Sequence, residues 1–230
     1  VYNTASGVKF PPDAPPPIIV EISAAGRGVA IFLGVVTIMI SLYCVWFIET
    51  YKSNKIIRAS QPEMLHWISF GGFLSGVRTI MGAIETSDLT CASDLWLGHM
   101  AYFFIVVTML LKSWRVHRIV NNKSLVRIKI TLGDIQVRLF GIMMCALVYL
   151  LVLQVVARPH TGFATEELAN QTTMWPNCRL DHSEFELTLF CIEFVILCFG
   201  ANLSHATKDI PAALNESRSI AEGMYDMYNC

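Results

Sequence analysis

The chain has 230 residues, of which 54% are hydrophobic and only 15% are charged. Its mean hydropathy is +0.50, whereas an ordinary soluble domain carries about 25% charged residues. This composition argues against a soluble helical protein. The net charge of −1 says little, because the signs are segregated by loop, and we expect no nucleic-acid partner.

Five apolar segments divide the chain. A bilayer core about 30 Å thick needs roughly 20 helical residues to cross it, and the first and fourth segments approach that length without a charge. The second segment contains Arg78 and the fifth contains Glu193. The sequence therefore predicts an all-α, multi-pass transmembrane helix bundle, with helices at about 28–49, 64–84, 95–116, 136–157 and 185–205 and the start of a sixth at 219–230.

Positive charge alternates between the loops that join these segments. The first loop has three Lys or Arg residues, the second (85–94) has none, and the third has seven. The fourth loop has only Arg158 and Arg179. Because Lys and Arg concentrate on the cytoplasmic side of membrane proteins, this alternation predicts a multi-pass plasma-membrane protein with an extracellular N-terminus.

The two ends of the sequence differ from the segments between them. Residues 1–26 contain repeated prolines, which favour an extended spacer and suit the end of a preceding domain. Residues 219–230 turn apolar again, and there the sequence stops. We interpret the sequence as a fragment of a longer chain, cut at both ends.

The topology also predicts two covalent features of the outer side. Five of the seven cysteines lie in apolar segments, which leaves Cys91 and Cys178 in outer loops, where the compartment is oxidising. Two outer cysteines permit one intramolecular bond, Cys91–Cys178, and the alternatives are two free thiols or an intermolecular bond. Among the Asn-x-Ser/Thr patterns only the one at Asn170 falls outside, so Asn170 is the expected glycosylation site.

Three polar side chains fall inside the apolar segments. A charge in a membrane span is costly and by default faces the bundle interior, as a candidate functional group. Glu193 lies near the middle of the fifth segment, Arg78 towards the outer end of the second, and His99 early in the third. One interpretation is that they border an outer-facing cavity. The other is structural: Arg78 snorkels to the surface, His99 makes a hydrogen bond, and Glu193 is protonated or paired between helices. A direct Glu193–Arg78 pair requires neighbouring helices and matching depths.

The sequence contains no constellation typical of an enzyme. It lacks the His-Glu-x-x-His, Gly-x-Ser-x-Gly and phosphate-loop motifs, and its six His residues show no metal-ligand spacing. We therefore expect no enzyme activity, no metal and no cofactor. A transporter or channel subunit with Glu193 and Arg78 lining a pathway is an alternative, although the predicted spans contain no proline and the two halves show no repeat.

The third apolar segment carries the most specific motifs. It opens with Cys91-Ala-Ser-Asp-Leu-Trp-Leu-Gly98 and closes with Leu111-Lys-Ser-Trp-Arg-Val-His-Arg118. Both motifs resemble the third helix of class C G-protein-coupled receptors, and the GABA-B-like branch is the nearest match. Ser60-Gln-Pro62 and Ile210-Pro-Ala-Ala-Leu-Asn-Glu-Ser217 are similar to inner loops of that family. The resemblance covers about residues 8–230 and implies a seven-helix receptor bundle, truncated here in the sixth helix.

The resemblance implies a signalling mechanism. In this family an extracellular two-lobed domain binds a small ligand and closes, a receptor homo- or heterodimer rearranges, and the helix bundle activates a heterotrimeric G protein. Residues 1–26 would be the linker from the missing ligand-binding domain, and residues 27–230 a partial seven-transmembrane domain. The linker contains no Cys, which favours the GABA-B-like branch. Cys91 and Cys178 match the family's bridge between the third helix and the second outer loop.

The resemblance also assigns roles at the inner side. Lys112 matches a basic residue at the inner end of the third helix and Glu216 an acidic residue before the sixth, a pair that holds the resting state in the family. Alternatively, Lys112 is only one of the positive charges that mark the cytoplasmic side, and Glu216 is a solvated charge in a loop. A structural membrane partner without G-protein activity is a further possibility. The basic loop is expected to face the G protein, and such a surface also attracts anionic membrane lipids; its residues are Arg115, Arg118, Lys123, Arg127 and Lys129.

Overall fold

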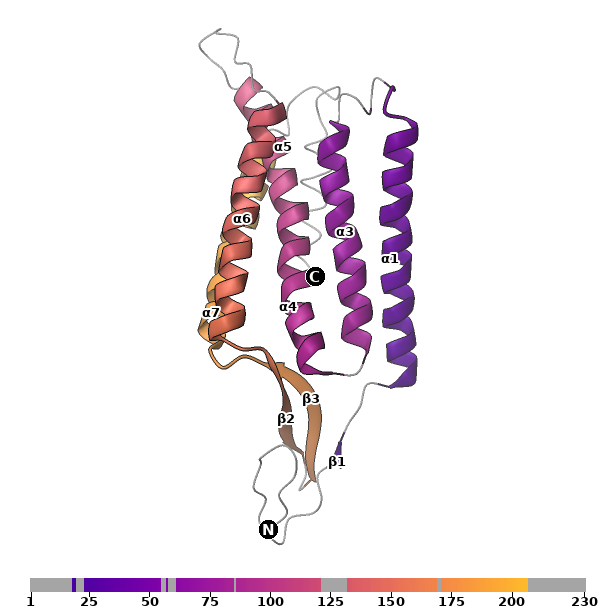
Figure 1. The fold of residues 1–230 in the computed structure, drawn as a ribbon, viewed down its shortest axis with the longest axis vertical. Coiled ribbons are helices and arrows are strands. Elements are labelled where there is room, and N and C mark those ends of the chain that lie inside the picture. The colour runs from indigo at the N-terminus through magenta and orange to yellow at the C-terminus, as the bar shows by residue number, and fades with distance from the viewer. Residues whose placement is uncertain are drawn as a thin grey trace.

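The computed structural model describes residues 18–19, 23–54, 57, 61–84, 86–120, 132–168 and 171–206. Within them, long helices run side by side and a small sheet lies at one end, called here the hairpin end (Figure 1). The helices are α1 (Ala24–Thr50), α3 (Pro62–Ala83), α4 (Asp88–Tyr102), the π-helix η1 (Phe103–Val107), α5 (Thr108–Val120), α6 (Leu132–Val156) and α7 (Ser183–Ala206). The strands are β1 (Ile18–Ile19), β2 (His160–Leu168) and β3 (Gln171–Arg179).

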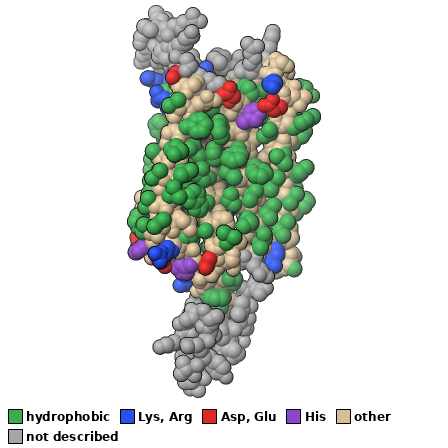
Figure 2. All heavy atoms as spheres, in the orientation of Figure 1, with side chains coloured by type: hydrophobic (Ala, Val, Ile, Leu, Met, Phe, Trp, Pro, Cys, Tyr) green, Lys and Arg blue, Asp and Glu red, His purple; other side chains and the backbone are tan. Residues whose placement is uncertain are grey.

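The exposed surface of the bundle is apolar. Large side chains such as Phe32, Trp46 and Val155 are more than half exposed, and Figure 2 shows hydrophobic side chains over the middle of the bundle with charged ones at its two ends. A surface of this kind is stable in lipid, where each helix satisfies its own backbone hydrogen bonds. Four of the described helices are long and apolar enough to cross a membrane: Ala24–Thr50, Asp88–Arg118, Gly133–Val156 and Ser183–His205. The predicted all-α, multi-pass fold is confirmed.

The second predicted span, α3, is not among these four helices. It carries Glu63, His66 and Arg78, which lower its mean hydropathy. Figure 1 nevertheless shows α3 lying between α1 and α4 and running alongside both. It therefore shares the depth of the membrane-crossing helices although its composition is more polar.

The third helix of the bundle (residues 88–120) consists of α4, η1 and α5 without a break. It begins at Asp88, whereas the apolar pattern predicts a start at 95. The reason is a capping box, in which the side chains of Ser87 and Thr90 each accept a hydrogen bond from the other's backbone N–H. Such a cap satisfies N–H groups that the first turn leaves without helical partners. The predicted outer loop 85–94 is therefore mostly helical.

The sheet at the hairpin end is an element that the all-α prediction missed. Strands β2 and β3 form an antiparallel hairpin, and β1 pairs in parallel with β3 through the registers Ile18↔Thr173 and Ile19↔Met174. The segment before α1 is thus joined by backbone hydrogen bonds to the connection between α6 and α7. Figure 1 shows the sheet projecting from the bundle below α4.

Glycine allows α3 to pack closely against both of its neighbours. A Cβ added at Gly76 would lie 2.9 Å from the carbonyl oxygen of Gly34 on α1, and one added at Gly71 would lie 3.0 Å from the carbonyl oxygen of Ala101 on α4. Small residues are the usual means by which membrane helices bring their backbones together. The main buried cluster joins α3, η1, α5, α6 and α7, and it comprises Met64, Phe103, Val107, Leu111, Ile135, Leu139, Met143, Ala146, Leu150 and Leu189.

This packing predicts opposite effects for two glycine substitutions on α3. Alanine raises helix propensity by about 1 kcal/mol over glycine, but Gly76→Ala places a methyl 2.7 Å from Cγ1 of Ile38 and should destabilise the protein by roughly 1–3 kcal/mol through overpacking. Gly82→Ala is the matched control, because nothing lies within 4 Å of the Cβ position at Gly82. The midpoint of thermal unfolding of this variant should equal or exceed that of the wild type. Thermal unfolding of the full-length protein in detergent measures both, and a Gly76→Ala midpoint at or above the wild type would contradict the close contact.

Candidate functional site

A cavity of about 160 Å³ lies in the half of the bundle near the hairpin end. Three helices contribute to it: α3, α4 and α7. Arg78, His99 and Glu193, the three polar residues singled out in the sequence, all line this cavity, and a functional role for them stays a prediction. The lining residues are Arg78, Asp94, Leu95, Gly98, His99, Tyr102, Glu186, Phe190 and Glu193.

His99 and Glu193 form a buried polar pair across α4 and α7. His99 is 5% exposed and Glu193 is 6% exposed, and Nδ1 of His99 shares a hydrogen bond with Oε1 of Glu193 at 2.7 Å. The hydroxyl of Tyr102 donates to the backbone carbonyl of Glu193, and the ring of Phe190 lies 5.2 Å from the His99 ring. Two side chains of α4 thus hold one residue of α7 by its carboxylate and its backbone.

Arg78 pairs with Asp94 and not with Glu193. Its Nε donates to Oδ1 of Asp94 at 2.8 Å and its terminal NH2 donates to Oδ2 at 3.2 Å, which is a two-point contact between α3 and α4. The guanidinium lies directly over Gly98, where an added Cβ would be 2.9 Å from Cζ. Glycine at this position therefore provides the space that Arg78 occupies.

The sequence pattern does not identify two residues that make hydrogen bonds at this cavity, Asp94 and Tyr102. Asp94 was placed in an outer loop because the predicted helix began one residue later. Asp94 lies four residues before Gly98, so in a helix that starts earlier the two residues share one face. This spacing is the signal that could have identified Asp94. Tyr102 lies within an apolar run and gave no signal, since a tyrosine there is more often part of a core.

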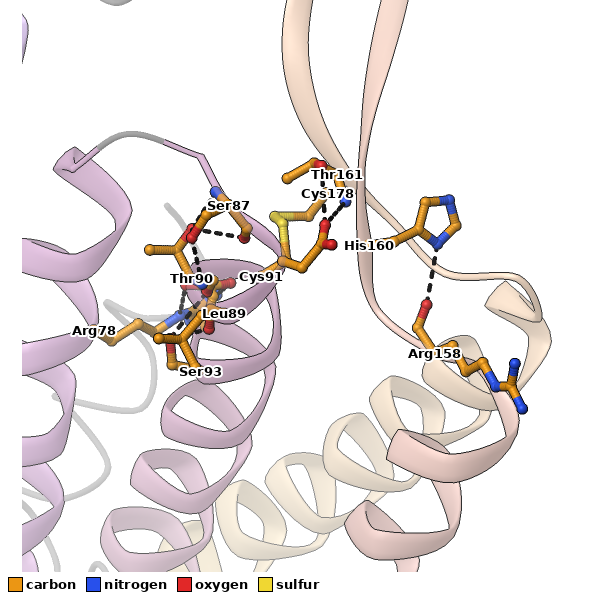
Figure 3. The surroundings of a disulfide bond; sticks show 12 residues. Arg78, Ser87, Leu89, Thr90, Cys91, Ser93, Arg158, His160, Thr161 and Cys178 are labelled. Carbon is orange, nitrogen blue, oxygen red and sulfur yellow. Dashed lines mark hydrogen bonds and ion pairs between the residues drawn. A yellow bond between two sulfur atoms is a disulfide. The ribbon is translucent and has the colours of Figure 1, made fainter. Parts of the chain in front are cut away.

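The disulfide lies beside this cavity. Cys91, in the first turn of α4, is bonded to Cys178 of β3, with a Cα–Cα distance of 5.4 Å (Figure 3). Oδ1 of Asp88, also in the first turn, accepts hydrogen bonds from the backbone N–H and the hydroxyl of Thr161 in β2, at 2.7 and 2.9 Å. Both strands of the hairpin are therefore attached to the same turn of α4. The predicted pairing is confirmed.

The opposite end of the bundle carries the predicted inner residues. Lys112 is buried in α5 at 9% exposure, Arg115 is partly buried, and Arg118 is exposed. The remaining residues predicted from sequence lie outside the described residues: Lys123, Arg127, Lys129, Asn170, Glu216 and the sixth helix at 219–230. The Lys112–Glu216 pair and the Asn170 glycan therefore stay predictions. Across the described ranges, no group of three or more His, Cys, Asp or Glu side chains is arranged to hold a metal ion.

Comparison with known proteins gives a consistent set of relatives. The family model described as "7 transmembrane sweet-taste receptor of 3 GCPR" matches residues 20–228. Over 104 residues the chain is 30% identical to metabotropic glutamate receptor-like protein J of Dictyostelium discoideum, covering 45% of the chain and 13% of that protein. Over 209 residues it is 27% identical to protein F of the same series and organism, covering 88% and 26%. It is 23% identical over 185 residues to the metabotropic glycine receptor of Bos taurus, covering 76% and 15%. The chain thus spans about a quarter or less of the length of these relatives.

Removal of the disulfide should weaken the attachment of the hairpin to α4, while the hydrogen bonds between Asp88 and Thr161 stay in place. Cys178→Ser should lower the stability of the full-length protein by about 2–4 kcal/mol, the usual contribution of a disulfide, and Cys91→Ser should have the same effect. The double variant should be no worse than either single one, because the two cysteines share one bond. Thermal unfolding in detergent measures this, with Cys145→Ser, a free exposed thiol, as the control. A non-reduced peptide map that links Cys91 to another cysteine would refute the pairing.

The buried pair should behave as a coupled unit. His99→Phe and Glu193→Leu each leave a buried polar partner behind and should cost roughly 3 kcal/mol. The double variant should cost less than the sum, with a coupling of roughly 1–3 kcal/mol in a double-mutant cycle. Glu186→Gln, in the same cavity and on the same helix, should be nearly neutral. Strictly additive effects of the two substitutions would show that the pair makes no net interaction.

Proposed function

Since the chain belongs to the family of class C G-protein-coupled receptors, whose membrane domain the match covers, we propose that it passes an extracellular signal to a cytoplasmic heterotrimeric G protein. In this proposal an upstream ligand-binding domain closes, a receptor dimer rearranges, and the helix bundle changes state. The hairpin end faces the outside, as the distribution of Lys and Arg predicts. Membership of the family implies that the chain is part of a membrane receptor. Ligand binding by an upstream domain, dimer rearrangement and G-protein activation are what we propose.

One observation carries the proposal: a single helix connects the proposed input to the proposed output. The third helix has Cys91 in its first turn, His99 and Tyr102 in its middle part, and Lys112 in its later part. A helix transmits axial displacement and rotation well because its backbone hydrogen bonds are local. A change imposed at the hairpin end therefore reaches Lys112 without needing any other element.

The sheet supplies the proposed input to this helix. The segment that precedes α1 pairs through β1 with β3, β3 carries Cys178, and Cys178 is bonded to Cys91. A displacement of the N-terminal segment is therefore communicated to the third helix by backbone hydrogen bonds and one covalent bond. This route supports a role for residues 1–26 as the linker from a ligand-binding domain.

The middle of the third helix contains an element suited to a change of state. The π-turn η1, at Phe103–Val107, follows directly after the residues that hold Glu193. π-turns are rare and occur often at functional sites. Within the described part of the chain, the hydroxyl of Thr108 is buried without a hydrogen-bond partner. We infer that the helix can shift its register here, which would move α7 relative to α5.

The inner end provides the proposed output. Lys112 would pair with Glu216 in the resting state, and separation of the pair would accompany activation. An opposite-charge pair of this kind biases a two-state bundle by a few kcal/mol at most. Arg115 and Arg118, towards the end of α5, would then contact the G protein together with Lys123, Arg127 and Lys129, which follow in sequence.

Two further parts of the proposal come from the sequence. Asn170 would carry a glycan, because the proposed topology puts its loop outside. The GABA-B-like branch stays a prediction, since the relatives described above carry glutamate- and glycine-receptor names. We do not extend the proposal to transport, because Arg78 and Glu193 are each engaged by a protein partner, Asp94 and His99.

The inner pair can be tested by signalling without ligand. Lys112→Ala in the full-length receptor should raise basal G-protein signalling, because the resting state loses its ion pair. Exchanging the charges, with Lys112→Glu and Glu216→Lys together, should restore the low basal level. Lys52→Ala, which removes an exposed positive charge on the same predicted side, should change nothing. Unchanged basal activity of Lys112→Ala at equal surface expression would sink the idea.

A further inference from the structure

A second cavity lies between α5 and α6, in the half of the bundle opposite the hairpin end. Its volume is about 340 Å³, and its lining combines apolar side chains with a single cation. Figure 2 shows Lys and Arg side chains at the upper left, over these ends of α5 and α6. The lining residues are Leu110, Leu111, Trp114, Arg138, Gly141 and Ile142.

Two guanidinium groups are gathered at one aromatic ring beside this cavity. Cζ of Arg138 lies 4.6 Å from the centroid of the Trp114 ring, and Cζ of Arg118 lies 5.8 Å from it. The two cations are therefore no more than about 10 Å apart. An aromatic ring attracts a guanidinium group through its negative face, and this contact leaves the N–H donors of the guanidinium available. These donors form a planar fork whose geometry matches the oxygens of a phosphate.

The charged groups around Arg118 and Arg138 have an excess of positive charge. Within the described residues neither guanidinium takes part in an ion pair, and both side chains are exposed. The acidic group that shares this face is Asp134, one helical turn before Arg138 on α6. His117 of α5 is a further titratable neighbour in sequence. This part of the two helices thus has one carboxylate for two guanidinium groups, so the local charge favours an anionic ligand.

The apolar part of the cavity has an open slot. An added Cβ at Gly141, an exposed residue in the middle of α6, would meet no atom within 4 Å. Leu110 and Ile142 lie beside this slot. A free phosphate or a polar peptide would leave such a surface uncovered, whereas an acyl chain would cover it.

We propose that this cavity binds an anionic phospholipid of the cytoplasmic leaflet. Arg118 and Arg138 hold the phosphate of the headgroup, and one acyl chain lies along Leu110 and Ile142 in the slot at Gly141. The choice of leaflet rests on the proposed function, which places this end of the bundle in the cytoplasm, where anionic lipids are concentrated. The site differs from the Lys112–Glu216 pair, because it opens to the lipid between α5 and α6.

The test uses the full-length protein in lipid nanodiscs. The discs contain phosphatidylcholine with a minor fraction of either phosphatidylserine or a phosphoinositide, and native mass spectrometry counts the lipids that stay bound. Anionic lipid should be retained in preference to phosphatidylcholine. Arg118→Gln and Arg138→Gln should each reduce this preference about five-fold, and Arg158→Gln, at the hairpin end, should leave it unchanged.

A second variant tests the acyl slot separately from the charges. Gly141→Leu should fill the slot without displacing protein atoms, so it should reduce retention of the diacyl lipid while leaving binding of a soluble inositol phosphate unchanged. Gly82→Leu, at another open glycine, is the control, and equal unfolding midpoints confirm that the variants are folded. An unchanged preference for anionic lipid in the Arg118→Gln/Arg138→Gln double variant would overturn the proposal. So would a Gly141→Leu variant that retains the diacyl lipid as well as the wild type.

This readout needs neither a ligand nor a G protein. A wild-type receptor that retains anionic lipid but does not signal would count against the proposed function alone. A wild-type receptor that signals but shows no preference for anionic lipid would count against the lipid site alone.

Discussion

The bond between Cys91 and Cys178 determines how the hairpin end of the molecule is organised. A two-stranded hairpin has no core of its own and is at best marginally stable in water. Here the bond, together with the contacts of Asp88 with Thr161, attaches both strands to the first turn of the third helix. The pairing of β1 with β3 then adds the segment before α1. Three parts of the chain that are far apart in sequence thus form one unit, and the third helix is its continuation into the membrane.

The buried pair of His99 and Glu193 has a different role from the bond. Taking two ionisable groups out of water costs free energy that their mutual contact only partly returns, so a buried pair is weak evidence for stability. What the pair does provide is a defined relation between α4 and α7, since Glu193 is held through both its carboxylate and its backbone carbonyl. Directly after this point the helix changes to a π-turn. The pair therefore fixes the position of α7 against α4 directly before the π-turn, at which we propose that the helix can change its register.

The sequence predicted the parts of this architecture that depend on length and charge, and missed those that depend on local caps and long-range pairing. Apolar length identified the spans, and the topology left Cys91 and Cys178 as the outer cysteines. The same reasoning placed Asp94 in a loop, because the cap at Ser87 extends the helix beyond its apolar part. Arg78 consequently has a partner, Asp94, that the apolar pattern does not predict. The hairpin was missed because its strands depend on each other and on the bond, and short apolar alternation alone does not distinguish them from a loop.

The two ends of the third helix make different contacts. At one end the attachment is covalent, through Cys91. At the other, Arg118 and Trp114 of α5 meet Arg138 of α6 at the proposed phosphate site. If a lipid binds one register of the helix more tightly than the other, it must shift the balance between the two states by that difference in affinity. By thermodynamic reciprocity, whatever displaces the helix at the hairpin end must then change the affinity for the lipid by the same factor.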